Sequence, residues 1–174
     1  RTLSPSANVF GSIDANDPSA LHFADAINNI NITYRAHKGG FHQDIKIKNL
    51  NALSFDGLNN EQAKAYIYTI INDSAFVIDS VSIKIADTDI NTGADEFRIT
   101  DEIRNDQIQF NIADGDNRKN LFSFDPSLIL DAQGKESGMA LRQLWRNPAN
   151  GSLYLVESVA LNALQNGSII DYQT

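Results

Sequence analysis

Two histidines and an aspartate at a predicted hairpin tip have the residue types and spacing to bind a transition metal. Gly39-Gly40 suits a two-residue hairpin turn, because both central positions of such a turn can adopt φ > 0. A turn there places His37 opposite His42, with Cβ atoms about 4.5–5.5 Å apart, and Asp44 one step along the same face. Two imidazoles and a carboxylate can together hold Zn²⁺ or Cu²⁺. The hairpin is therefore a candidate transition-metal site.

The same hairpin also has a simpler interpretation as a ribbon with one face in water. Polar and apolar residues alternate along both strands, so that one face is polar and the other mostly apolar. The polar face holds Thr33, Arg35, His37, His42, Asp44 and Lys46. In this register Arg35 faces Asp44, and an exposed ion pair of that kind contributes only about 0–1 kcal/mol. A solvated face explains the pattern without a metal, and both interpretations stay open.

A second candidate site is the acidic segment 87–95, where oxygen-bearing side chains recur at alternate positions. The candidate ligands are Asp87, Asp89, Asn91 and Asp95. Calcium takes six to eight oxygen ligands, and the spacing resembles the D-x-D-x-[DN]-x-x-x-D loops that bind Ca²⁺ in surface adhesion proteins. Thr92 stands where glycine is usual, and Gly93 follows it. We expect Ca²⁺ as the one candidate cofactor, and an acidic turn between two strands is the alternative.

Helices are expected at three places around these segments. Apolar residues recur at helical spacing over 59–74, which predicts a helix with one apolar stripe. Asp17-Pro18 has the form of a helix start, and 139–146 fits a second short helix. The tail, 153–164, fits either a helix or a buried strand.

Strands are expected over most of the remaining chain. The hairpin gives strands over 31–38 and 41–48, and bulky apolar runs predict strands over 76–86, 96–103, 107–112, 121–130 and 168–172. This order lacks the strand–helix alternation of a parallel sheet. It predicts an α+β fold: an antiparallel, sheet-rich single domain over 18–174 with one or two packed helices, preceded by an extended arm or linker over 1–17. The alternative is a β-sandwich with helical additions.

Composition and charge exclude several classes of partner and of site. The chain has 174 residues, no cysteine and a formal net charge of −8. Nucleic-acid binding needs clustered Lys and Arg, so we expect no nucleic-acid partner. Without cysteine there are no disulfides and no thiolate metal ligands. No apolar stretch reaches the roughly 18 residues of a membrane span, so we expect no direct membrane insertion by this fragment.

These features favour a non-catalytic extracytoplasmic domain, an adhesive, filament or matrix module stabilised by calcium. The chain opens on Arg1, which we interpret as a processed or excised form. The expected partners are other proteins or further copies of the chain. One alternative is the ligand-sensing domain of a membrane receptor. Another is a metal-dependent enzyme that uses the His37, His42 and Asp44 cluster, although known catalytic motifs are absent from the sequence.

Overall fold

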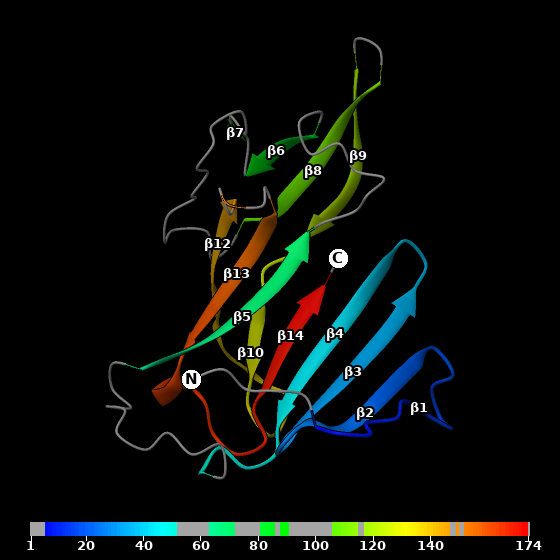
Figure 1. The fold of residues 1–174 in the computed structure, drawn as a ribbon, viewed down its shortest axis with the longest axis vertical. Helices are drawn as coiled ribbons and strands as arrows, with labels where there is room; N and C mark the ends of the chain where they lie inside the picture. The colour runs from blue at the N-terminus through cyan, green and yellow to red at the C-terminus, as the bar shows by residue number, and fades with distance from the viewer. Residues whose placement is uncertain are drawn as a thin grey trace. The chain divides into compact units, whose positions relative to one another are not determined.

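The chain forms two compact units that are built almost entirely from antiparallel strands (Figure 1). The computed structural model describes residues 6–51, 63–71, 81–85, 88–90, 106–114, 117–146, 149 and 152–173. The first unit comprises Arg1–Lys64, Ser127–Met139 and Ala160–Thr174, and the second comprises Ala65–Pro126 and Ala140–Val159. Because the chain passes between the units several times, neither unit is a continuous stretch of sequence.

The first unit is a seven-stranded sheet in the order β1-β2-β3-β4-β14-β10-β11. Its strands are β1 (Ser12–Ile13), β2 (Ala20–Ile27), β3 (Ile30–His37), β4 (Gly40–Ile47), β10 (Leu128–Leu130), β11 (Glu136–Met139) and β14 (Ile169–Gln173). Each neighbouring pair is antiparallel. The predicted hairpin strands and the final strand are confirmed. β1 lies within the segment that was expected to be an extended arm.

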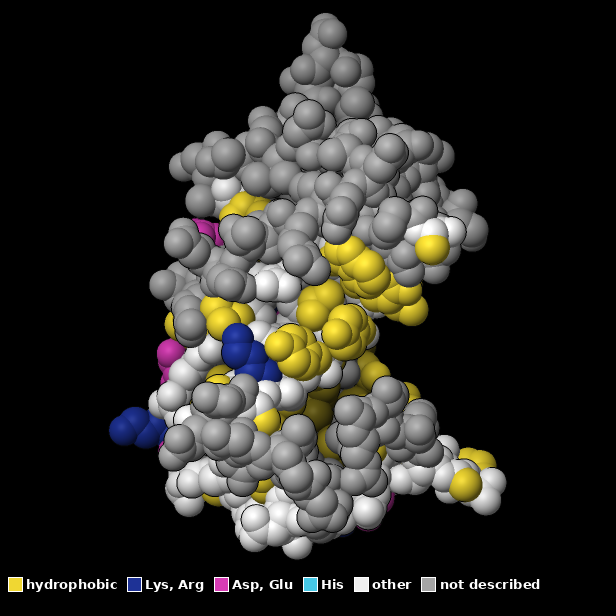
Figure 2. Space-filling model, turned by 60° about the vertical axis from the view of Figure 1, so that its left-hand side comes forward, with side chains coloured by type: hydrophobic (Ala, Val, Ile, Leu, Met, Phe, Trp, Pro, Cys, Tyr) yellow, Lys and Arg dark blue, Asp and Glu magenta, His cyan; other side chains and the backbone are white. Residues whose placement is uncertain are grey.

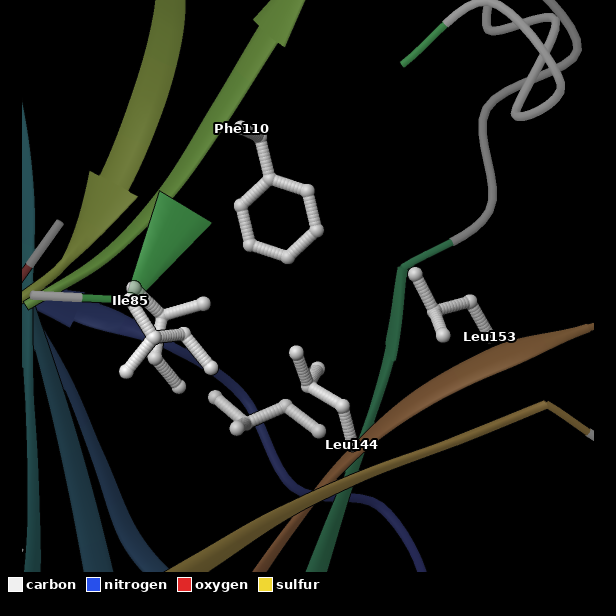
Figure 3. Close-up of a cluster of buried hydrophobic side chains, with 6 residues drawn as sticks. Ile85, Phe110, Leu144 and Leu153 are labelled. Atoms are coloured by element: carbon white, nitrogen blue, oxygen red, sulfur yellow. The ribbon is translucent and has the colours of Figure 1, made fainter. Parts of the chain in front are cut away.

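The second unit contains a three-stranded sheet, β12-β13-β5, and a four-stranded sheet, β7-β6-β8-β9. The strands are β5 (Lys64–Ile71), β6 (Val81–Ile85), β7 (Thr88–Ile90), β8 (Ile108–Asp114), β9 (Asn117–Phe124), β12 (Leu141–Arg146) and β13 (Leu153–Ala160). Side chains from both sheets meet in one buried cluster (Figure 3): Ile85, Ile108, Phe110, Leu144, Leu153 and Leu155. Two sheets that share a core in this way fit the sandwich of the predicted alternative. The packed helices of the predicted α+β fold and the helical additions of the alternative are wrong for the described residues, where the one complete helical element is a 3-10 turn.

The predicted helix over 59–74 is wrong where the structure describes it, because Lys64–Ile71 is strand β5. Exposure alternates strictly along β5, as the period of two in a strand requires. Every residue of the segment Tyr66–Ile71 is aromatic or β-branched, and such residues favour strands. A run this rich in apolar residues matches helical spacing by chance, so the apolar stripe did not distinguish a helix from a strand.

The two shorter predicted helices are also wrong. Asp17 begins a turn, in which its carboxylate accepts a hydrogen bond from the backbone N–H of Ser19, and strand β2 follows. The segment that was expected to form a helix over 139–146 contains strand β12. The ambiguous tail is strand β13 followed by a 3-10 turn over Leu161–Ala163. Within the described ranges, no helix is long and apolar enough to cross a membrane.

Candidate functional site

The β3–β4 hairpin turns one residue earlier than the sequence predicts. His37 pairs with Gly40, which leaves Lys38 and Gly39 as the loop, and Gly39 adopts a left-handed φ of +88°. Arg35 therefore lies opposite His42 instead of Asp44, and the predicted opposition of His37 and His42 is wrong. Each residue of β3 therefore pairs with a β4 residue that is two positions earlier than the predicted partner. The polar side chains consequently stay on the predicted face.

A third strand brings an aspartate to this face. β14 pairs with β4 so that Asp171 lies directly opposite Asp44. The Nε2 atom of His42 lies 2.6 Å from Asp171 Oδ1 and 3.3 Å from Asp44 Oδ1. One ligand atom from each of the three residues falls within 4.8 Å of the others. We refer to His42, Asp44 and Asp171 as the His42 cluster.

The His42 cluster is largely shielded from water. Asp171 is only 9% exposed, and the side chains of Asp44 and His42 are 16% and 22% exposed. The Nε2 atom of His42 is itself buried, and it makes no well-aligned hydrogen bond within the described residues although two carboxylate oxygens lie close to it. Three polar atoms thus point at one partly enclosed position.

Arg35 holds the cluster from the side of β3. Its Nη1 atom forms an ion pair with Asp44 Oδ2, and its Nε atom lies 3.5 Å from Asp17 Oδ2. The hydrogen bond to Asp44 raises the pKa of Arg35 above its usual value, which outweighs the opposite effect of burial. The guanidinium group therefore stays charged and fixes one oxygen of Asp44.

The cluster belongs to a row of polar register partners that crosses five strands. The row runs through Ser12, His22, Thr33, Asp44 and Asp171. His22 Nδ1 and Thr33 Oγ1 are 2.9 Å apart and share a hydrogen bond. Sequence reasoning missed Asp171, because alternation along one strand does not reveal which strand lies next to it.

The other predicted site residues are placed only in part. His37 is exposed, and it is not a member of the convergent group. Asp87, Asn91 and Asp95 lie outside the described residues. Asp89 lies in β7, where its backbone pairs with that of Lys84. The calcium site therefore stays a prediction.

No protein-family model, curated protein or solved structure matches this chain. The site is therefore interpreted from its own geometry. An imidazole nitrogen between two carboxylate oxygens can act in two ways. It can form an ion-pair network with Arg35, or it can provide one nitrogen and two oxygen ligands to a divalent cation.

Proposed function

We propose that this chain is a non-catalytic structural module that works outside the cytoplasm by associating with other copies of itself. The observation that carries the proposal is the outward face of β5. Tyr66, Tyr68 and Ile70 lie on that face and are 55%, 58% and 58% exposed. β5 is also the last strand of its sheet among the described strands. Ligand sensing and metal-dependent catalysis remain predictions from the sequence.

An edge strand with exposed aromatic residues is suited to pairing with another chain. Edge strands carry backbone N–H and C=O groups that a further strand can use, and soluble proteins commonly protect them with charge or proline. The rings of Tyr66 and Tyr68 are stacked with centroids 6.4 Å apart. Tyrosine is enriched in protein interfaces because it combines apolar area with a polar hydroxyl group.

The outer face of the same sheet carries a second aromatic pair. Trp145 and Tyr154 are register partners, and their rings stack with centroids 5.4 Å apart. Their neighbours Leu144, Leu153 and Leu155 are in the buried cluster, so the period of two turns this pair outward. Figure 2 shows hydrophobic side chains grouped on the surface that it draws. Trp145 and Tyr154 are half-buried, so the exposed aromatic area that supports assembly comes mainly from Tyr66 and Tyr68.

Sedimentation velocity over a range of protein concentrations tests this proposal. We expect the average mass to rise with concentration, and we expect Tyr66→Ser combined with Tyr68→Ser to suppress the rise. Phe10→Ser is the matched control, because Phe10 is 83% exposed but belongs to the first unit. A wild-type chain that stays monomeric up to its solubility limit contradicts self-association.

Calcium is the second part of the proposal and has a separate test. A ligand that binds only the folded state adds about 2.7 kcal/mol of stability at 100 times its Kd. We expect the melting temperature to be higher in excess Ca²⁺ than in chelator, and Asp87→Asn with Asp95→Asn to remove the difference. Superimposable melting curves of the wild type rule out a structural calcium site of useful affinity.

A further inference from the structure

We propose that His42, Asp44 and Asp171 bind a divalent first-row transition-metal cation on the polar face of the seven-stranded sheet. None of these three residues belongs to the 87–95 segment or to β5, so the proposal does not rest on the residues that carry the proposed assembly.

The two oxygens of Asp44 have separate tasks. Oδ2 forms the ion pair with Arg35, whereas Oδ1 points toward His42 Nε2 at 3.3 Å. A carboxylate that binds metal through one oxygen is commonly oriented by a hydrogen bond to the other. Arg35 is thus a positioning residue that leaves Oδ1 available to a cation.

The three donors are held by paired strands instead of loops. Asp44 and Asp171 are direct register partners across β4 and β14, and His42 is two residues before Asp44 on the same face. Donors on strands are positioned more accurately than donors on loops. His42 Nε2 is buried and lies 2.6 Å from Asp171 Oδ1 and 3.3 Å from Asp44 Oδ1, so a cation bound by all three atoms would replace the direct imidazole–carboxylate contact.

The donor set indicates the class of cation. One imidazole nitrogen and two carboxylate oxygens suit first-row transition metals, whereas Ca²⁺ and Mg²⁺ prefer oxygen alone. Water would complete the coordination of a cation held by these three donors.

Calorimetric titration of the purified chain with Zn²⁺ tests the site. We expect one ion per chain, and we expect His42→Ala and Asp171→Asn each to weaken binding by more than the roughly 10–100-fold cost of losing an outer-shell partner. His37→Ala is the matched control and should leave the affinity unchanged, because His37 is on the same hairpin but outside the cluster. Equal losses in His37→Ala and His42→Ala would move the site to the hairpin tip and overturn the proposal.

A second measurement uses only the wild-type chain, so it does not depend on whether a variant folds. Mn²⁺ broadens the nuclear magnetic resonance signals of nearby residues. We expect the backbone amides around His42, Asp44 and Asp171 to broaden first and to recover when Zn²⁺ is added. Broadening centred elsewhere, or none, would show that the cluster is an ion-pair network and not a metal site.

Discussion

The two units place an arginine beside acidic groups in opposite ways. In the second unit, Arg142 of β12 and Glu157 of β13 are register partners, and both are fully buried. In the first unit, Arg35 lies on the polar face of the seven-stranded sheet with its side chain 38% exposed. Burial lowers the pKa of Arg142, although Glu157 opposes this, whereas the hydrogen bond to Asp44 raises the pKa of Arg35.

The partners of the two guanidinium groups show what each cluster does. Arg142 donates to the backbone carbonyl oxygens of Phe124 and Asp125 at 3.2 and 2.9 Å, and also to that of Asp106. It therefore fixes the chain just before β8 and at the end of β9, which is a structural task. Arg35 donates to side-chain carboxylates, and side chains can rearrange around a ligand. A buried arginine with backbone acceptors, such as Arg142, has a structural role. Partly exposed side chains that converge, such as those around Arg35, are better suited to binding a ligand.

The comparison is tested most severely by Arg142→Ala, for which we expect the largest loss of stability. Removing one of two oppositely charged buried residues typically costs about 3–5 kcal/mol, because the charge of the other, here Glu157, stays buried, and the carbonyl groups also lose their donor. Urea denaturation, monitored by tryptophan fluorescence, measures this loss in the second unit, because Trp145 is the one tryptophan of the chain and lies on β12. A loss below about 1 kcal/mol, the range of an exposed pair, would contradict the structural task.

The matched control is the double variant Arg142→Met with Glu157→Leu. Replacing a buried ion pair by apolar residues of similar volume is often close to neutral. We expect this variant to recover most of the stability that Arg142→Ala loses. No recovery would mean that the three carbonyl contacts of Arg142 matter more than its charge.

A smaller effect is expected at the turn that sets the register of the His42 cluster. Gly39 has a φ of +88°, and a side chain in that region costs about 1–2 kcal/mol. Gly40 begins β4 and is not among the glycines with positive φ in the described chain. Denaturation should therefore show a clear loss for Gly39→Ala and a lesser one for Gly40→Ala. A larger loss of stability for Gly40→Ala than for Gly39→Ala would instead support the Gly39-Gly40 turn that the sequence predicted.

Arg35→Ala should destabilise the chain by less than about 1 kcal/mol, because a partly exposed ion pair gains little over its solvated state. The measurement is again denaturation, followed here by far-ultraviolet circular dichroism because the first unit has no tryptophan. A cost close to that of Arg142→Ala would remove the contrast between the two units.

The parts of this molecule that sequence could predict are those that depend on neighbours along the chain. The hairpin strands and the polar face with Arg35, His42 and Asp44 follow from alternation, and alternation is local. The helix over 59–74 failed because Tyr66–Ile71 is so apolar that two periods fit it, and packing decided between them. Asp171 was out of reach because its partner strand β4 is more than 120 residues away in sequence. One of the three residues of the His42 cluster thus depends on long-range pairing that no short motif records.

The smallest expected effect concerns Asp17, the outermost member of the network around Arg35. Its carboxylate accepts hydrogen bonds from the hydroxyl and backbone N–H of Ser19, at 2.5 and 3.1 Å. These contacts hold the pKa of Asp17 below its ordinary value of 3.8, with the Ser19 hydroxyl the largest cause and Arg35 a lesser one. A carboxyl group whose pKa is lowered by folding stabilises the folded state above its unfolded pKa. That contribution disappears as the pH falls through the folded pKa.

Ser19→Ala should therefore raise the pKa of Asp17, which a carbon-13 titration of its carboxyl group can follow. Ser12→Ala is the control, because Ser12 donates to the carbonyl oxygen of His22 and should leave Asp17 unchanged. If Ser19→Ala has no effect and Arg35→Ala raises the pKa, the ion pair governs Asp17 instead of the turn. The charge network of the first unit would then extend from the His42 cluster as far as Asp17. Binding of a cation at the cluster would in that case change the pKa of Asp17.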